Sequence, residues 1–251
     1  MADKQKFPSE IIDLPSGGKL YGKDNPLSSG KIEIKYMTAK EEDILTSQNL
    51  IKKGVVLDVL LDSLILTEGI KSDDLLLGDK NGIMIASRIL AYGPEYLVEI
   101  QNPVTGEKFE HNFNLADCPF KELPNDVDYS VNEFIMELPI SKSNIKYKLL
   151  TGVDEKNIIK ESQARMKFGQ GTSEITTRLK HSIIEVDGKS EIGIINTFVD
   201  NMLSKDSLAL RNEMNRITPD IILIQDIEME GEMVKVNIPM TTNFFWPDVT
   251  A

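Results

Sequence analysis

Residues 32–66 read IEIKYMTAKEEDILTSQNLIKKGVVLDVLLDSLIL, and the architecture can be worked out from this stretch. Apolar and charged residues alternate over 32–36, which predicts a half-buried strand. Thr38, with Glu41 three residues later, is typical of a helix start, because the hydroxyl and the carboxylate cap free amides of the first turn. Lys-Lys-Gly at 52–54 predicts the end of that helix, since cations and a left-handed glycine suit its last turn.

The residues that follow predict two further helices and a pair of strands. Residues 55–66 are apolar at nine of twelve positions, so we expect a central helix that is covered over most of its circumference. A third helix is expected over roughly 79–90, capped by Asp79. Strands are expected at 96–101 and 107–115, because the proline and glycine between them suit a hairpin connection.

The same landmarks recur in the same order in the second half of the chain. Leu14-Pro15 recurs as Leu138-Pro139, and the strand with its helix start at 31–38 recurs at 144–151. Helices are expected at about 173–184 and 204–216, and a second hairpin around Gly231. This order favours an internal duplication. The alternative is two α+β domains that share ordinary turn chemistry by chance.

We therefore expect an α+β protein made of two related units, each with about three helices and an antiparallel hairpin. Residues 1–30 are expected to form an N-terminal arm and first strand, and 31–118 the first α+β unit. Residues 119–130, rich in proline and acidic residues, are expected to be a linker. Residues 131–251 then form the second unit, which ends in an aromatic tail.

Composition and charge exclude several classes of protein. With 41% hydrophobic and 27% charged residues, the chain has the composition of an ordinary globular protein. Its net charge of −12 disfavours nucleic acid and anionic membranes as partners, and no apolar stretch is long enough to span a bilayer. The single cysteine, Cys118, forms neither an internal disulfide nor a zinc cluster, so we expect a reducing compartment and no structural metal.

Sequence patterns for catalysis are missing. The glycines near Gly18 and Gly169 do not have the spacing of a phosphate or dinucleotide loop. His111 and His181 belong to different predicted elements, and no G-x-S-x-G motif accompanies them. Cys118 is expected to be a small buried side chain. We therefore expect no catalytic residue, no cofactor and no metal site, and we interpret the chain as a protein that is not an enzyme.

Two segments are candidates for a protein interface. Lys80 and Arg88 are expected to be exposed on the helix at 79–90, although a capped core helix explains the same pattern. Phe244, Phe245 and Trp246 lie close to the C-terminal end of a chain with few aromatic residues. They are either a plug folded onto the chain's own core or an anchor for a neighbouring protein, and the sequence leaves both open.

The stretch 32–66, together with LLLGDKNGIMIASRILAYGPEY at 75–96 and the aromatic tail at 244–247, resembles the baseplate hub assembly proteins of T4-like contractile-tailed phages. The second half, through LTGVDE at 150–155 and EVDG at 185–188, is also similar to phage tail assembly chaperones. Relatives carry cysteine pairs where this chain has 100–106, so the resemblance transfers no zinc site.

The resemblance implies a structural protein without catalytic activity, which acts at the central hub of the baseplate through contacts with hub proteins and the tape-measure protein. It implies assembly in the host cytoplasm and a final place in the tail of the virion. The alternative is a transient chaperone that holds the tape-measure protein and is absent from the finished particle. A third class, a hydrolase that uses acids such as Glu41, Asp58 and Asp62, has no support in the sequence.

Overall fold

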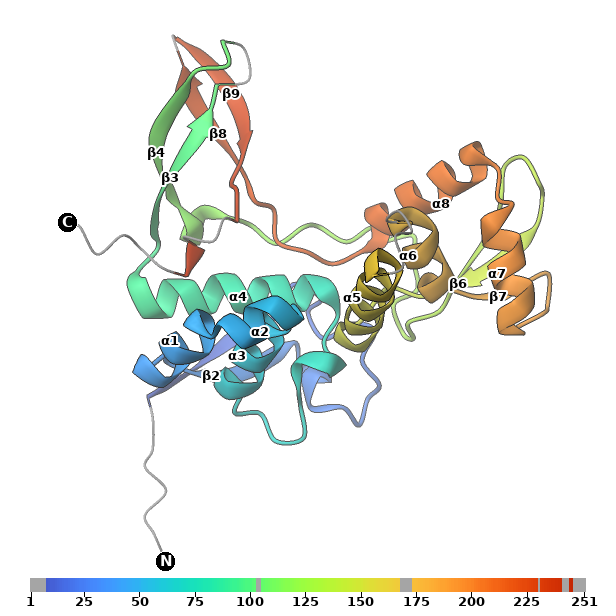
Figure 1. Ribbon diagram of the computed structural model, residues 1–251, viewed down its shortest axis with the longest axis horizontal. Coiled ribbons are helices and arrows are strands. Elements are labelled where there is room, and N and C mark those ends of the chain that lie inside the picture. Colours follow the sequence, from blue (N-terminus) through green and yellow to red (C-terminus); the bar gives the residue numbers. More distant parts are fainter. Residues whose placement is uncertain (1–7, 103–104, 168–172, 230, 241–243, 246–251) are drawn as a thin grey trace, which may run out of the picture.

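The chain forms two bodies that are joined by two extended segments, as Figure 1 shows. The computed structural model describes residues 8–102, 105–167, 173–229, 231–240 and 244–245. Its helices and small antiparallel sheets make it an α+β protein, in agreement with the class predicted from the sequence.

The first body takes its elements from both ends of the chain. They are β1 (Ser9–Asp13), η1 (Pro26–Ser29), β2 (Lys31–Lys35), α1 (Ala39–Thr46), α2 (Gln48–Lys53), α3 (Val56–Leu64), η2 (Ser72–Asp74), α4 (Leu77–Tyr92), β3 (Glu95–Gln101), β4 (Lys108–Asn114), η3 (Leu115–Asp117), β8 (Ile224–Met229) and β9 (Glu232–Asn237). β1 pairs antiparallel with β2, and the hairpins β3–β4 and β8–β9 are both antiparallel.

The second body is continuous in sequence. Its elements are β5 (Phe134–Glu137), β6 (Asn144–Tyr147), α5 (Gly152–Lys167), α6 (Glu174–Ser182), β7 (Ile183–Val186), α7 (Ile192–Asp200) and α8 (Ser204–Ile217). Strand β6 lies between β5 and β7 and pairs antiparallel with both. Strands β5 and β7 and helix α7 were not anticipated from the sequence.

Two predicted helices differ from the structure at positions where side-chain chemistry favours another conformation. The helix expected over 38–53 is divided into α1 and α2 at Ser47, whose backbone is extended, in keeping with the preference of serine for helix ends. The helix expected over 173–184 ends at Ser182, because the β-branched Ile183 continues as strand β7 and pairs with Tyr147 of β6.

Each body contains a similar lysine–carboxylate contact of its own, at the point where a strand leads into a helix. In the first body Lys35 Nζ donates to Glu41 Oε1 at 2.7 Å, and Thr38 binds the other carboxylate oxygen. In the second body Lys148 Nζ donates to Asp154 at 2.7 Å, and Thr151 binds the same carboxylate. Each carboxylate therefore caps a helix and neutralises a lysine at the end of the preceding strand.

A second similarity is an aspartate at the start of the helix that precedes each hairpin, where it binds backbone N–H groups of a distant segment. Asp79 is the third residue of α4, and its buried carboxylate accepts from the backbone N–H of Ser16 at 2.8 Å. Asp206 is the third residue of α8, and it accepts from the N–H of Ile140 at 2.8 Å and that of Ser141 at 3.0 Å. Each carboxylate thus fixes the segment after a Leu-Pro pair to a helix N-terminus. Asp79 lies inside α4, whose N-cap is Leu76, so the expectation that Asp79 caps this helix was wrong.

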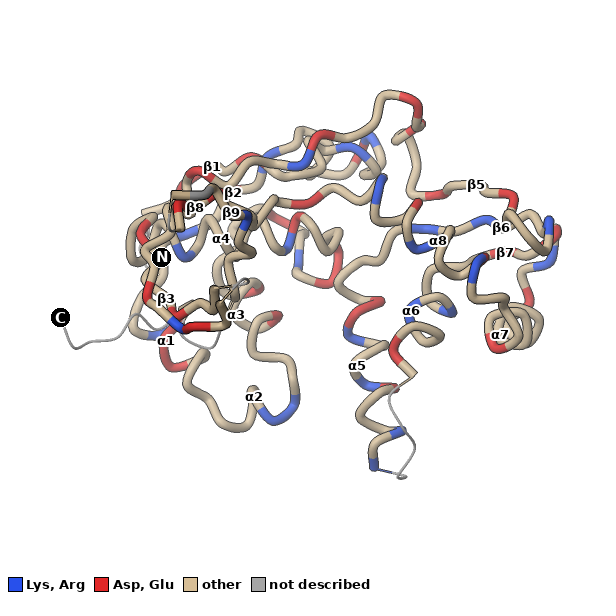
Figure 2. Tube along the Cα trace, turned by 90° about the horizontal axis from the view of Figure 1, so that it is seen from above, with Lys and Arg blue, Asp and Glu red and all other residues tan. Residues whose placement is uncertain are grey.

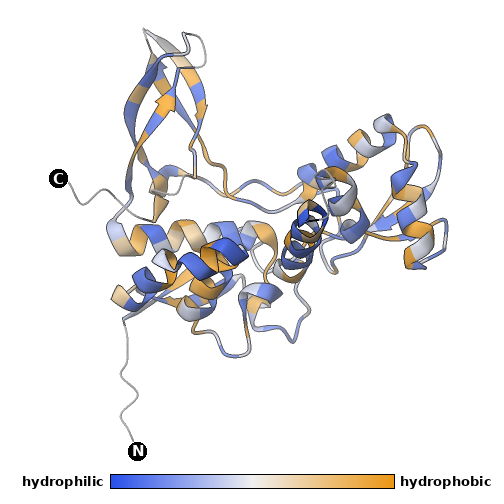
Figure 3. Cartoon of the chain, viewed as in Figure 1, coloured by the Kyte–Doolittle hydropathy of each residue, from blue (hydrophilic) through white to orange (hydrophobic). Residues whose placement is uncertain are grey.

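The two hairpins pack against each other in the first body. The sequence had predicted one hairpin in each unit. In Figure 1 they lie side by side, and Figure 3 shows hydrophobic and hydrophilic residues alternating along their strands. Ile100, Phe113, Ile227 and Val236 belong to one buried cluster with the helices of the first body. A single hairpin cannot bury its apolar face alone, so each hairpin supplies the cover for the other.

The packing therefore differs from the boundaries expected from the sequence. Leu14 and Leu27, from the segment expected to be an arm, lie inside the core of the first body. The last part of the expected second unit, from Ile227 to Phe245, contributes to that same core. The expected linker at 119–130 contains no helix or strand, but Phe120 bridges to Ile221 and the Tyr129 hydroxyl donates to the Ile217 carbonyl at 3.2 Å.

Backbone contacts hold the two bodies against each other at the starts of α4 and α5. Gly152 N donates to Leu75 O at 2.8 Å, and Leu77 N donates to Leu150 O at 3.3 Å. A Cβ atom added to Gly152 would collide with the carbonyl oxygen of Ser72. The absence of a side chain at this position is therefore what allows the two backbones to approach.

Replacing Gly152 with alanine is expected to lower the free energy of unfolding by about 2–3 kcal/mol, because the colliding atom belongs to the backbone and cannot rotate away. Gly193→Ala is the matched control, since Gly193 also lies in the first turn of a helix and a Cβ there meets nothing within 4 Å. Urea unfolding followed by circular dichroism measures both variants. Equal stability of the two variants would contradict the close approach.

Glu41 makes the stability of the first body dependent on pH. Burial alone would raise the pKa of Glu41, but hydrogen bonds from Lys35, Ser63 and Thr38 outweigh it and lower the pKa from 4.5 to about 2. Because the folded-state pKa is depressed, the stabilisation is fully present above pH 4.5 and is lost as the pH falls towards 2. The difference between these two pKa values corresponds to about 3 kcal/mol in the free energy of unfolding.

Glu41→Gln is therefore expected to destabilise the protein by about 2–3 kcal/mol at pH 7, since it leaves Lys35 buried without its carboxylate. The deficit relative to the unmodified chain is expected to shrink between pH 4.5 and pH 2. Asp43→Asn, at an exposed position of the same helix, is the control. Denaturant titrations at several pH values measure the deficit, and a deficit that does not change with pH would refute the assignment.

Candidate functional site

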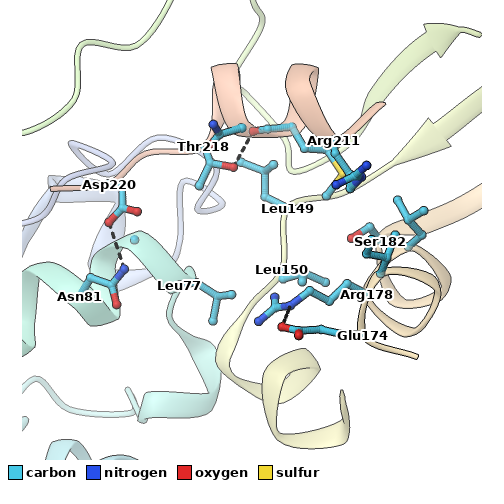
Figure 4. A pocket seen from close by; sticks show the side chains of 15 residues that line it. Leu77, Asn81, Leu149, Leu150, Glu174, Arg178, Ser182, Arg211, Thr218 and Asp220 are labelled. Carbon is cyan, nitrogen blue, oxygen red and sulfur yellow. Dashed lines mark hydrogen bonds and ion pairs between the residues drawn. The ribbon is translucent and has the colours of Figure 1, made fainter. Parts of the chain in front are cut away.

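A groove runs along the seam between the two bodies, and we call it the seam groove. It consists of three adjoining cavities of about 480, 540 and 540 Å³. The first lies between the start of α4 and helices α6 and α8, and its lining is drawn in Figure 4. The second lies between α3, α4 and α5, and the third between the ends of α2 and α5. The first two cavities share Leu77, Asn81 and Arg178, so they form one depression.

Large apolar side chains line the seam groove without being covered. Leu57 of α3 is 38% exposed, Ile175 of α6 is 50% exposed and Met166 of α5 is 55% exposed. Ile175, Leu179 and Ile183 follow one another in steps of four residues, as in the apolar stripe of a helix, yet only Leu179 and Ile183 are buried. The first turn of α6 faces the groove, where the second body supplies nothing to cover it. Apolar side chains gathered in a concave surface are typical of a protein-binding site.

The acidic side chains of the seam groove all have partners within it. Arg178 donates to Glu155 at 2.9 Å and lies 3.8 Å from Glu174. Lys80 pairs with Asp58 at 2.5 Å. Asp220, in the segment between α8 and β8, accepts from the side-chain amide of Asn81 at 3.0 Å, and this contact is drawn in Figure 4.

In contrast to Lys80 and Arg178, four basic side chains of the groove have no ion-pair partner among the described residues. Lys52, Lys53 and Lys167 line the third cavity and Arg211 lines the first, and within the described part of the chain none of them has a carboxylate within 4 Å. Figure 2 shows basic residues at the end of α2 and along α5. In a chain with a net charge of −12, the end of the seam groove between α2 and α5 is therefore locally cationic.

Two buried polar atoms of the groove, the Ser182 hydroxyl and Oε2 of Glu155, have no hydrogen-bond partner among the described residues. Ser182 is fully buried. In Figure 4 it lies on the same side of the first cavity as Arg211. Buried hydroxyl groups normally have a partner, so this position can accept or donate one further hydrogen bond.

Lys80 and Arg88 are buried, which corrects the expectation that they are exposed interface residues. Lys80 is 8% exposed and forms part of the groove floor through its ion pair with Asp58. Arg88 is 3% exposed, and burial lowers the pKa of its guanidinium. The reason is that α4 is enclosed by α3 on one side and by the hairpins at its end, so the long side chains are directed to partners inside the first body.

The described residues of the aromatic tail, Phe244 and Phe245, form a plug on the chain's own core. Phe244 is 2% exposed and Phe245 is 4% exposed, and the Phe244 ring meets the edge of Tyr96 at 5.3 Å between centroids. Arg88 Nε donates to the Phe244 carbonyl at 2.7 Å, which ties the tail to α4. Two of the three tail residues therefore fold onto the chain's own core. Trp246 lies outside the described residues.

The remaining residues considered from the sequence have structural partners. Cys118 is 8% exposed, and burial raises the pKa of its thiol, as suits a small core residue. His111 packs against Phe113 at 4.7 Å between ring centroids. His181 lies 3.5 Å from Glu161. Asp62 accepts from the N–H of Ser72 at 2.7 Å.

Apart from Lys80, the residues that line the seam groove were not predicted as interface residues from the sequence. They come from six helices in both halves of the chain, and none of them stands in a recognisable motif. The one available signal was Ile175, an apolar residue in the first turn of a strongly amphipathic helix.

No described helix is long and apolar enough to cross a membrane. Across the described ranges, no three His, Cys, Asp or Glu side chains are grouped so that they could hold a metal ion. Comparison with family models, with curated proteins and with solved structures found no match to the chain.

Phe244→Ala is expected to lower the free energy of unfolding by about 3 kcal/mol or more, because it removes a fully buried aromatic ring and leaves a cavity beside Tyr96. Phe120→Ala, at a position that is 42% exposed, serves as the control and is expected to cost less than about 1 kcal/mol. Thermal and urea unfolding measure both. A Phe244→Ala chain of unchanged stability would favour the anchor interpretation of the tail.

Proposed function

We propose that the chain is a non-enzymatic structural and assembly protein of a phage baseplate hub, which acts by docking other proteins. Its partners are then hub proteins and the tape-measure protein, and it stays in the tail of the virion. The observation that carries the docking role is the seam groove, because uncovered apolar side chains and unneutralised cations are gathered there. The phage setting comes from the resemblance of residues 32–66, 75–96 and 244–247 to the hub assembly family.

The groove suits docking because its walls are held in place before a partner arrives. The backbone contacts of Gly152 and Leu77 cross from one body to the other, and the contact of Asn81 with Asp220 holds the segment between α8 and β8 against α4. A preformed site loses little conformational entropy on binding, so more of the contact energy appears as affinity. We further propose that the two bodies descend from one duplicated unit, and the paired Lys35–Glu41 and Lys148–Asp154 contacts support this.

Protein mass spectrometry of purified virions tests the proposal. We expect the chain in a constant ratio to the other baseplate proteins. Its absence from finished particles, together with its presence in assembly intermediates, would instead favour the transient chaperone of the tape-measure protein. Absence from both would refute the proposal.

A matched pair of variants tests whether docking uses the seam groove. Ile175→Asp places a charge on the apolar lining and is expected to reduce the yield of complete tails at least tenfold in a complementation assay. Ile192→Asp, at a position of α7 that is 76% exposed and outside the groove, is expected to leave the yield unchanged. Equal yields for the two variants would contradict docking at the groove.

A further inference from the structure

We propose that the partner segment bound in the seam groove is an amphipathic helix with an apolar face flanked by Asp or Glu side chains. This inference rests on the proposed docking function and specifies the chemistry of the partner.

The walls of the groove favour a helix over an extended strand. They are formed mainly by helices α2, α3, α4, α5, α6 and α8, which present side chains and not free backbone groups. An extended peptide gains affinity by pairing with the open edge of a sheet, and no described strand lines these three cavities. A helix needs only an apolar trough, and Leu57, Met166 and Ile175 supply exposed apolar contacts along it.

The charges favour acidic flanks. Lys52, Lys53 and Lys167 stand at one end of the groove without a carboxylate partner, and Arg211 lines the cavity at the other end. The acidic residues of the groove, two of which line the same cavity as Arg211, are already in contact with Arg178, Lys80 or Asn81. Carboxylates on the partner would meet these cations at the rim, where charge pairing selects the partner and speeds association. A basic helix would meet the same cations with repulsion.

The chemistry of the floor argues against nucleic acid as the occupant. Glu155, Glu174 and Asp58 line the groove and would face a phosphate backbone that followed it. The apolar side chains on the floor also offer nothing to phosphates. A protein helix uses both the apolar floor and the unpaired cations.

Two synthetic helical peptides of about eighteen residues provide the probe. Both carry the same Leu and Ile face with a spacing of three and four residues, and one has Glu on its flanks where the other has Lys. Binding to the purified full chain is followed by fluorescence anisotropy. We expect the Glu peptide to bind at least tenfold more tightly than the Lys peptide, and this preference to weaken several-fold as the salt concentration rises.

Three variants locate the binding site. Ile175→Asp is expected to weaken binding of the Glu peptide at least tenfold, and Arg211→Glu to reduce its advantage over the Lys peptide at least threefold. Lys205→Glu, an exposed lysine of the same helix that does not line the groove, is the control and is expected to change neither. Circular dichroism checks that each variant is folded.

Equal binding of the two peptides, no binding of either, or an effect of Lys205→Glu as large as that of Arg211→Glu would overturn the inference. So would concentration-dependent self-association of the chain that Ile175→Asp abolishes, because the groove would then belong to a second copy. The measurement uses only purified chain and peptides, whereas the proposed function is tested on virions. A failure of the inference about the acidic helix can therefore be distinguished from a failure of the proposed baseplate function.

Discussion

The antiparallel contact between Leu75–Leu77 and Leu150–Gly152 is the constraint on which the arrangement of the molecule depends. Leu76 bridges to Thr151, and the backbone hydrogen bonds on either side join the start of α4 to the start of α5. Thr151 is at the same time held by Asp154, which is paired with Lys148. The seam is therefore built from backbone groups whose positions are already determined by helix capping. The groove lies directly beside this seam, so its shape is set by the least adjustable part of the structure.

The proposed common origin of the two bodies has its best support in their buried polar contacts. A lysine at the end of a strand pairs with the carboxylate that caps the next helix in each body, and an aspartate at the third position of a later helix binds the segment after Leu-Pro in each. Apolar core positions can be exchanged among similar side chains with little cost, but a buried carboxylate needs its specific partners. Retention of such contacts is therefore better support for a common origin than similarity in apolar patterning.

The predictable part of the fold was the part governed by neighbouring residues. The Thr38 and Glu41 cap, the apolar helix around Leu60 and both hairpins follow from patterns within a few residues, and the structure contains them. What the sequence did not reveal depends on contacts between distant segments. Ile183 continues a helical stripe in sequence but pairs with Tyr147 as a strand, and the second hairpin lies against the first body. The seam groove depends on distant contacts in the same way, since Ile175 and Leu57 come to line one groove only after the two bodies are joined.

Helix α4 carries Lys80 and Arg88, the two residues that the sequence analysis expected to be exposed and that are buried. The same helix connects the core of the first body with the seam groove. Its charged residues each bind a different segment: Asp79 binds Ser16, Lys80 binds Asp58 and Arg88 binds Phe244. Buried polar and charged groups are costly without a hydrogen-bond or ion-pair partner, so these three contacts favour the observed placement of the segments around the helix. Its first turn, Leu77 to Asn81, forms one wall of the seam groove. The same polar contacts that orient the N-terminal arm, α3 and the aromatic tail around α4 therefore also fix the wall against which we propose that a partner docks.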